Sequence, residues 1–244
     1  MGRLAIIGGS GFSAIAGLEV ASSSAETPYG AASAPVARGT MASREVLFLP
    51  RHGSPHRIPP HRINYRANIW ALREAGAEQI VALAAVGGVT EPFAPGVLAV
   101  PHQIIDYTYD RTQTFYDGGE GEVVHVDFTR PYTDSLRDRL IEAGLRTGMP
   151  VVGHGVYGAT QGPRLETAAE VRRLERDGCD LVGMTGMPEA ALARELGLEY
   201  AALAFVVNWA AGKGAGEIQM SEIESNLKAC AARVERLLTA FAEA

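Results

Sequence analysis

The sequence predicts a single α/β domain that spans residues 1–244. Along the whole chain, short apolar runs alternate with segments whose apolar residues recur at helical spacing, as in proteins whose strands alternate with helices. The run AALAFVVNW, residues 201–209, is apolar except for Asn208 and suits a buried strand of a sheet that is covered on both faces. A composition of 47% hydrophobic and 20% charged residues is that of an ordinary globular protein with a large core.

Strands are predicted where short apolar runs are bounded by glycine or polar residues. In chain order they cover residues 3–7, 46–49, 80–85, 97–105, 151–157, 180–182 and 199–207. Residues 22–42 are rich in alanine, serine and proline, which predicts a loop or a weak hairpin. The chain contains no internal repeat, in agreement with a single domain.

Helices are predicted where apolar residues recur every three or four positions. They cover residues 63–75, 132–145, 167–176 and 188–196, and a long last helix begins near residue 221. Capping boxes open the third and the last of them: Thr167 with Glu170, and Ser221 with Glu224. The apolar face of the last helix is formed by Ile223, Leu227, Cys230, Val234, Leu237, Leu238 and Phe241.

Composition and charge exclude several classes of protein. A net charge of −6 and a pI near 5.6 argue against a surface that binds nucleic acid. No apolar stretch is long enough to span a membrane, and the N-terminus MGRLAIIGGSG lacks the features of a signal peptide. Cys179 and Cys230 do not have metal-site spacing and predict no disulfide framework. We therefore expect a soluble cytoplasmic protein with reduced thiols.

A glycine-rich segment, IIGGSGF, follows the first predicted strand. Its glycines let the main chain approach an anion closely, and Ser10 adds a hydroxyl group. Gly9, Gly11 and Ala14 also match the spacing of a nicotinamide dinucleotide fold, but Glu26 is poorly placed as the acidic residue that this fold requires. An anion-binding loop, a dinucleotide-binding loop and a plain tight turn are all open at this point.

A basic segment, LPRHGSPHRIPPHRINY, stands out in an otherwise acidic protein. Its glycine and prolines exclude a continuous helix. Because the guanidinium group is a planar fork that suits phosphate, Arg51 and His52 are candidates for anion binding, and a solvated basic loop is the alternative. The histidines come with no carboxylate or cysteine, and arginine is a poor neighbour for a divalent cation, so we expect no metal site.

Polar residues recur where other predicted strands end. Glu166 follows the strand at 151–157, Thr185 follows the strand at 180–182, and Asn208 ends the strand at 199–207. Open α/β folds bind ligands at one edge of the sheet, so we expect these side chains to gather there. The alternatives are that Glu166 only complements a helix dipole and that neighbouring main chain satisfies the Asn208 amide.

Taken together, these segments resemble the trimeric purine nucleoside phosphorylases, and particularly their methylthioadenosine phosphorylase branch. The matching stretches stand in the family's order over nearly the whole chain: IIGGSGF, RHGSPHRIPPHRINYRANIWAL, AAVGGV, QTFYDG, TQGPRLETAAE, GMTGMPEAALARELG and AFVVNWA. The resemblance implies a nucleoside phosphorylase-like α/β domain, with a mixed, twisted and partly barrel-like sheet flanked by helices. It also implies a homotrimer that cleaves a nucleoside with inorganic phosphate as co-substrate, without metal or redox cofactor.

The resemblance also assigns residues to the two substrates. Phosphate contacts would come from Ser10, Arg51, His52, Thr185 and the main chain at Ala84 and Ala85. Nucleoside contacts would come from Leu165, Glu166, Met184 and Asn208, and His125 would reach the site of a neighbouring subunit. Arg51, His52 and Asn208 would carry catalysis, through electrostatic stabilisation and positioning.

Departures from the adenosine-type pattern predict the base. That branch has aspartates where this chain has Asn208 and Ala210. An asparagine amide can donate to O6 and accept from N7–H, and Glu166 can accept from N1–H, which hypoxanthine and guanine have and adenine lacks. Each mismatched group costs about 1–3 kcal/mol. Two of them would disfavour adenine by a factor on the order of a thousand.

The 5′ end of the sugar is predicted to meet Met220 and Ile223, where typical 6-oxopurine phosphorylases have a histidine. This chain has no histidine after His154, and a methylthio group suits Met and Ile better than a hydroxyl does. The predicted substrate is 5′-methylthioinosine. One alternative is that Met220 and Ile223 only pack the last helix, and another is that inosine, guanosine or methylthioadenosine is the main substrate. From other classes, the protein could be a nicotinamide-dependent oxidoreductase or a non-catalytic nucleoside-binding module.

Overall fold

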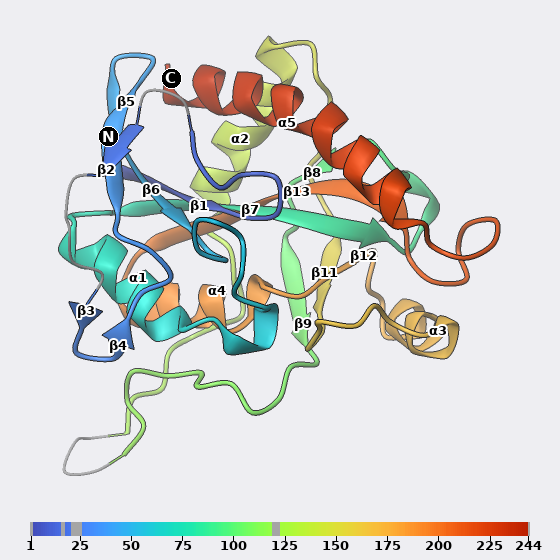
Figure 1. The fold of residues 1–244 in the computed structure, drawn as a ribbon, viewed down its shortest axis with the longest axis horizontal. Coiled ribbons are helices and arrows are strands. Elements are labelled where there is room, and N and C mark those ends of the chain that lie inside the picture. Colours follow the sequence, from blue (N-terminus) through green and yellow to red (C-terminus); the bar gives the residue numbers. More distant parts are fainter. Residues whose placement is uncertain (1, 16–17, 21–25, 119–122, 244) are drawn as a thin grey trace.

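A computed structural model describes residues 2–15, 18–20, 26–118 and 123–243 of the protein. Within them, eleven strands form one mixed sheet, in which the path β10-β8-β13-β7-β1-β6-β5-β2 is extended by β12, β11 and β9 at the end of β7 (Figure 1). The strands are β1 (Leu4–Gly8), β2 (Leu18–Val20), β5 (Ala37–Met41), β6 (Arg44–Pro50), β7 (Gln79–Gly88), β8 (Leu98–Ala99), β9 (Gln103–Asp106), β10 (Val151–Val152), β11 (Val156–Ala159), β12 (Leu181–Gly183) and β13 (Glu199–Trp209). The fold class expected from the sequence is confirmed.

Helices cover both faces of this sheet. They are α1 (Tyr65–Glu74), α2 (Asp134–Arg146), α3 (Ala168–Arg176), α4 (Gly186–Glu195) and α5 (Met220–Ala242), with 3₁₀ turns η1 (Pro60–Arg62) and η2 (Glu91–Phe93). Figure 1 shows α2 and α5 together on one face of the sheet and α1 and α4 on the other. Among the described residues, no helix combines the length and the apolar character that a membrane crossing requires.

Side chains of β1 alternate between two apolar cores. Leu4 and Ile6 pack with residues of α2 and α5, whereas Ala5 and Ile7 pack with residues of α1 and α4. Successive side chains of a strand point to opposite faces, so a strand with helices on both sides must be apolar throughout. This arrangement explains the uninterrupted apolar runs in the sequence.

Two predicted strands are each divided in two. The strand expected at residues 97–105 is interrupted at Pro101, which has no N–H for a ladder, and gives β8 and β9. The strand expected at 151–157 is interrupted near Gly155, whose φ is +119°, and gives β10 and β11. β8 pairs with β10, and β9 pairs with β11. Each break carries the chain from the main path of the sheet to its extension.

The region expected as a loop or weak hairpin contains more structure than predicted. β3 (Glu26–Thr27) and β4 (Gly30–Ala31) form a two-stranded hairpin, and β5 pairs antiparallel with β6. Residues 22–25 of this prediction lie outside the described residues. The five residues of β5, ARGTM, include a glycine and no apolar run, which made this strand hard to recognise.

The first predicted capping box is confirmed and the second is wrong. Thr167 Oγ1 accepts from Glu170 N at 3.1 Å, and Glu170 Oε2 accepts from Thr167 N at 2.7 Å. The last helix instead begins at Met220 after an extended Gln219, so Ser221 is already helical and cannot cap it. The predicted apolar face of this helix, α5, packs into the core that it shares with α2 and the sheet. Both cysteines are free and buried.

Candidate active site

A cavity of about 400 Å³ collects the residues that the sequence singled out. It is lined by every predicted site residue except one: Ser10, Arg51, His52, Ala84, Ala85, Leu165, Glu166, Met184, Thr185, Asn208, Met220 and Ile223. β1 is parallel to β6 and β7, and β7 is parallel to β13, so the carboxyl ends of these strands meet at one edge of the sheet. This edge is where open α/β sheets bind ligands.

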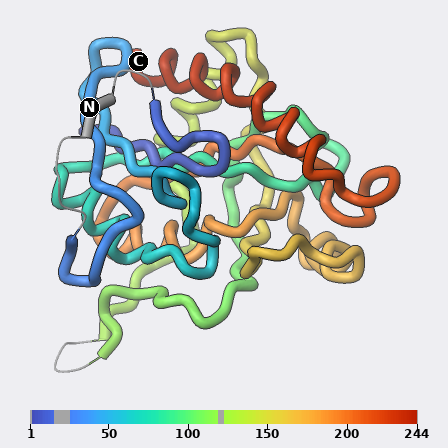
Figure 2. Tube along the Cα trace, in the orientation of Figure 1, coloured from blue at the N-terminus to red at the C-terminus, as the bar shows by residue number. Residues whose placement is uncertain are grey.

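His125 is the residue that does not line this cavity. It is exposed and lies in the irregular segment between β9 and α2. Figure 2 shows this segment, in light green, at the edge of the molecule opposite α5. Its assignment to the site of a neighbouring subunit stays a prediction.

Arg51 is the most buried charged residue of the cavity wall, with a side chain only 1% exposed. Its Nε and Nη2 donate to the two carboxylate oxygens of Glu189 at 2.7 and 2.8 Å, and its Nη1 donates to the Leu83 carbonyl at 2.9 Å. Burial alone would lower the pKa of Arg51, but the charge and hydrogen bonds of Glu189 outweigh it and raise this pKa, so the guanidinium stays charged. A solvated basic loop is therefore the wrong interpretation of this residue.

The glycine segment packs directly on this guanidinium. A Cβ atom at Gly9 would lie 2.5 Å from the Leu83 carbonyl oxygen and 3.1 Å from Nη1 of Arg51, so only glycine fits there. Among the described residues between β1 and β2 there is no helix, although a dinucleotide-binding loop must open one. The nicotinamide interpretation of these glycines is therefore wrong, and a tight turn beside a buried cation is what the structure contains.

His52 is buried beside Arg51 and lies in a stack of two imidazoles. Its ring lies parallel to that of His56, with centroids 4.2 Å apart, and its Nδ1 is 2.8 Å from the Ile58 carbonyl oxygen. Burial first, and the positive charge of Arg51 second, lower the pKa of His52 to about 4. At neutral pH the ring is therefore uncharged. Since a carbonyl can only accept, Nδ1 carries the proton and Nε2 has a free lone pair.

We expect His52→Asn to weaken the dependence of stability on pH. The folded pKa of about 4 lies below the ordinary value of 6.5, so between these values the unfolded chain binds a proton that the folded chain does not. The free energy of unfolding of the wild type should therefore fall as the pH drops from 7 toward 4. Between pH 7 and pH 5 the variant should lose about 1–2 kcal/mol less than the wild type in urea unfolding. Identical losses would contradict the neutral, buried imidazole.

Asn208 stands at an irregularity of β13. Val206 pairs with Val86 and Asn208 pairs with Gly87, so the intervening Val207 has no partner on β7. Such a bulge bends a strand and re-aims the side chains beside it. The Asn208 amide is buried and its Nδ2 donates to the Trp209 carbonyl at 2.7 Å. The second N–H of Nδ2 and the carbonyl oxygen of the amide remain available to a ligand.

Glu166 lines the same cavity and is half-buried. Its Oε1 accepts a hydrogen bond of 2.6 Å from the Thr160 hydroxyl. Ala210, at the position where the adenosine-type pattern has a second aspartate, also lines the cavity and is buried. The cavity lining therefore includes the Asn208 amide, the Glu166 carboxylate and the Ala210 methyl group.

The cavity also receives residues from the starts of two helices, α4 and α5. Thr185 is the N-cap of α4, but its side chain makes no capping hydrogen bond, so the hydroxyl is not consumed by the helix. Met187 has non-helical φ and ψ, and regular helix begins at Pro188, as the sequence predicted. From the start of α5 and the residues before it, the cavity receives Ile218, Met220, Ile223, Leu227 and the carboxylate of Glu224.

Two residues that hold parts of the cavity in place were not predicted from the sequence. Glu189 is fully buried, binds Arg51 and accepts from the Tyr200 hydroxyl at 2.8 Å. An acid within the apolar run MPEAALA was the available signal. Arg111 donates to the carbonyls of Gln161, Met184 and Met187 at 2.7–2.8 Å. Its segment, DRTQTF, has no local pattern that marks it.

The chain is similar in sequence to curated nucleoside phosphorylases. The sequence is 57% identical over 225 residues to a probable S-methyl-5′-thioinosine phosphorylase of Pseudomonas syringae pv. tomato, with 92% of each chain covered. It is 47% identical over 228 residues to the 6-oxopurine nucleoside phosphorylase of Pyrococcus furiosus, covering 91% of this chain and 85% of that one.

The fold is also that of a solved structure. The methylthioadenosine phosphorylase of Schistosoma mansoni in complex with adenine superposes with a TM-score of 0.91 at 29% identity, covering 99% of this chain and 91% of that one. The sequence matches the Phosphorylase superfamily over residues 3–243. Because this match takes in almost the whole chain, the protein belongs to the phosphorylase superfamily.

Proposed function

We propose that the protein catalyses the phosphorolysis of S-methyl-5′-thioinosine to hypoxanthine and 5-methylthioribose 1-phosphate. The observation that carries the proposal is one cavity in which Asn208 and Glu166 accompany Arg51, His52 and an apolar patch from the start of α5. The amide and the carboxylate match a 6-oxopurine, the cation matches phosphate, and the apolar patch matches a methylthio group. The names of the most similar relatives support the same class of reaction.

Phosphate is proposed to lie against Arg51, His52, Ser10 and Thr185. Arg51 uses three of its five N–H groups inside the protein, which leaves one on Nη1 and one on Nη2 for the phosphate. Glu189 balances the charge of Arg51, so hydrogen bonds contribute much of the binding. Neutral His52 offers a lone pair at Nε2, which can accept from the one hydroxyl of a phosphate dianion.

The reaction replaces one bond at C1′ by another. As the bond from C1′ to N9 breaks, positive charge develops on the sugar and the electron pair moves to the base. Phosphate stabilises the cationic sugar and then forms the new bond to C1′. The departing base gains a proton at N7, which balances the hydroxyl proton that the phosphate dianion loses when it becomes the sugar phosphate. Asn208 stabilises the base by donating to O6 and accepting from the protonated N7, and Glu166 accepts from N1–H. The phosphate is the nucleophile, so we propose no metal and no redox cofactor.

Inosine is the second candidate substrate, and Glu224 favours it. This carboxylate lines the same cavity as Met220 and Ile223 and could accept from a 5′-hydroxyl. Four apolar residues line the same part of the cavity as Glu224: Ile218, Met220, Ile223 and Leu227. We therefore rank the methylthio nucleoside first.

We further propose a cytoplasmic homotrimer in which a neighbouring subunit covers the mouth of the cavity. Leu165 is 40% exposed and Met220 is 61% exposed, although both line the cavity. Large apolar side chains in such a position favour contact with another chain. His125, exposed on its irregular segment, is the residue proposed to reach across.

The test is base release from four nucleosides, each with and without phosphate: methylthioinosine, methylthioadenosine, inosine and guanosine. We expect methylthioinosine to have the highest kcat/KM and all activity to require phosphate. Equal or faster turnover of methylthioadenosine would contradict the roles of Asn208 and Glu166. Higher kcat/KM for inosine would favour the second candidate, and activity without phosphate would indicate hydrolysis.

A further inference from the structure

We infer that Thr160 is a positioning residue for recognition of the base, because its hydroxyl fixes one oxygen of the Glu166 carboxylate and leaves the other to bind the purine. The inference rests on the proposed function and deepens it. Thr160 does not line the cavity that would hold the nucleoside, so it acts through Glu166.

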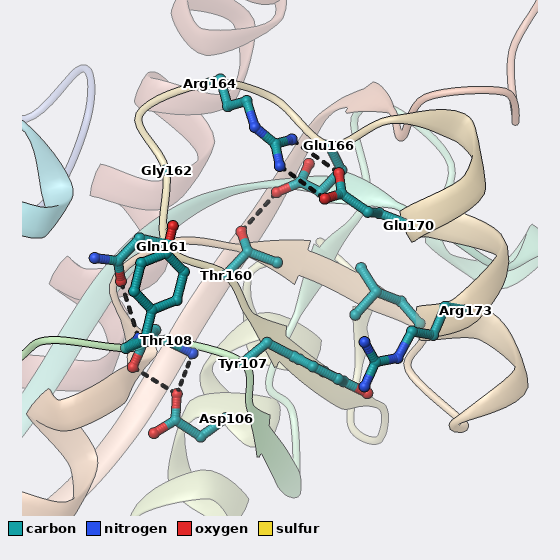
Figure 3. Close-up of a pocket in the computed structure, with 12 residues that line it drawn as sticks. Asp106, Tyr107, Thr108, Thr160, Gln161, Gly162, Arg164, Glu166, Glu170 and Arg173 are labelled. Carbon is teal, nitrogen blue, oxygen red and sulfur yellow. Dashed lines mark hydrogen bonds and ion pairs between the residues drawn. The ribbon is translucent and has the colours of Figure 1, made fainter.

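The contact itself is short and unambiguous in direction. The Thr160 hydroxyl lies 2.6 Å from Oε1 of Glu166 and 3.3 Å from the Gly183 carbonyl oxygen. A hydroxyl has one proton, and the Gly183 carbonyl already accepts from Thr160 N at 2.8 Å. The proton therefore goes to the carboxylate, as a charge-assisted hydrogen bond. Figure 3 shows this bond linking the two side chains.

Contacts other than this bond hold the main chain of Thr160 in place. Thr160 directly follows β11, whose last residue, Ala159, pairs with Gly183 of β12. On its other side, Arg111 donates to the carbonyls of Thr160 and Gln161 at 3.3 and 2.7 Å. The hydroxyl is thus presented from a rigid sheet end, whereas Glu166 lies on the loop that leads to α3. The bond therefore ties the loop to the sheet.

A competing cation near Glu166 is held elsewhere. Arg164 makes two hydrogen bonds to Glu170, of 2.8 and 2.7 Å (Figure 3). Glu170 also accepts from Thr167 N in the capping box. Among the described residues, Oε2 of Glu166 has no hydrogen-bond partner. Glu170 thus holds the hydrogen-bonding groups of Arg164, and within the described part of the chain Thr160 is the one residue that hydrogen-bonds the Glu166 carboxylate.

A second cavity, of about 430 Å³, gives the Glu166 carboxylate another direction in which to turn if the bond from Thr160 is lost. Glu166 lines both this cavity and the nucleoside cavity, so it stands on the wall between them. The second cavity is also lined by Thr160, Arg164 and Arg173. Without the hydroxyl, the carboxylate is free to turn into this second cavity, which Arg173 also lines, and away from the base. Thr160 therefore holds Glu166 in the orientation that a 6-oxopurine requires.

The test compares Thr160→Val, which keeps the shape and removes the hydroxyl, with Thr160→Ser, which keeps the hydroxyl. Thr160→Val should lower kcat/KM for methylthioinosine about tenfold, mainly through KM, because one charge-assisted hydrogen bond to N1–H is weakened. Its kcat/KM for methylthioadenosine, which has no N1–H, should stay within about twofold of the wild type, and Thr160→Ser should match the wild type on both substrates. In a Glu166→Ala background, Thr160→Val should have no further effect.

Other outcomes overturn the inference and remain distinguishable from failure of the proposed function. Equal losses on both nucleosides, or a full effect in the Glu166→Ala background, would show that Thr160 only supports the fold. Absence of methylthioinosine phosphorolysis in the wild type would reject the proposed function instead. Unfolding midpoints identify any misfolded variant, and Thr160→Ala, which places no methyl group beside Gly183, then repeats the test.

Discussion

Replacing Glu189 by glutamine is expected to lower the free energy of unfolding by about 3–5 kcal/mol. The side chains of Arg51 and Glu189 are 1% and 0% exposed, and their hydrogen bonds are 2.7 and 2.8 Å long. Glutamine keeps the shape but leaves a charged guanidinium in the core without a counterion, and it turns an N–H₂ group toward N–H donors. The Tyr200 hydroxyl, which donates to the same carboxylate, loses a charged acceptor as well.

Urea unfolding of the wild type and Glu189→Gln, with and without phosphate, measures this effect. Phosphate should stabilise the variant more than the wild type, because an uncompensated Arg51 attracts a dianion more strongly. Glu45→Gln is the matched control: Glu45 pairs with Arg38 at 2.9 Å on the surface, and its loss should cost about 0–1 kcal/mol. A cost at Glu189 no larger than at Glu45 would contradict a buried, charged pair.

Asn208→Asp is expected to lower kcat/KM for methylthioinosine more than tenfold. A carboxylate at this position repels O6 of the base and cannot donate to it, which removes one hydrogen bond and adds an unpaired buried acceptor. It also faces the Trp209 carbonyl, to which the amide now donates at 2.7 Å. Two acceptors then meet, so the new side chain must turn away from its present orientation.

Asn226→Asp separates these two effects. Asn226 also donates from Nδ2 to a main-chain carbonyl, that of Val207, at 2.7 Å, but it does not line the cavity. The same loss of an amide donor should therefore lower stability there without changing the preference among nucleosides. Steady-state kinetics give the ratio of kcat/KM for methylthioinosine to kcat/KM for methylthioadenosine, which measures the preference. If Asn208→Asp and Asn226→Asp leave this ratio equal, Asn208 does not touch the base.

Local signals in the sequence located most of the fold and of the cavity. Apolar runs marked the central strands, the capping box at Thr167 marked the start of α3, and Asn208 marked the end of β13. The errors in the predicted strands lie where pairing with strands distant in sequence decides the course of the chain. Pro101 and Gly155 interrupt predicted strands at the points where the chain changes its place in the sheet.

Residues that act through another side chain could not be found in the same way. Arg51 and Glu189 are 138 positions apart, and nothing in either segment specifies the pairing. Thr160 looks like an ordinary residue after a strand until Glu166 is placed beside it. Sequence patterns report burial and local geometry, whereas these roles depend on which segments the sheet brings together.

Arg111 sets a condition on how the protein can admit a ligand. A single planar guanidinium donates to carbonyls of the loop that precedes Glu166 and of the turn that contains Met184 and Met187. Neither segment can shift alone without breaking charge-assisted bonds to the other. Arg111 therefore fixes the spacing between the groups proposed to meet the purine and those proposed to meet the ribose before a nucleoside arrives. We therefore expect substrate and product to exchange without these two segments parting.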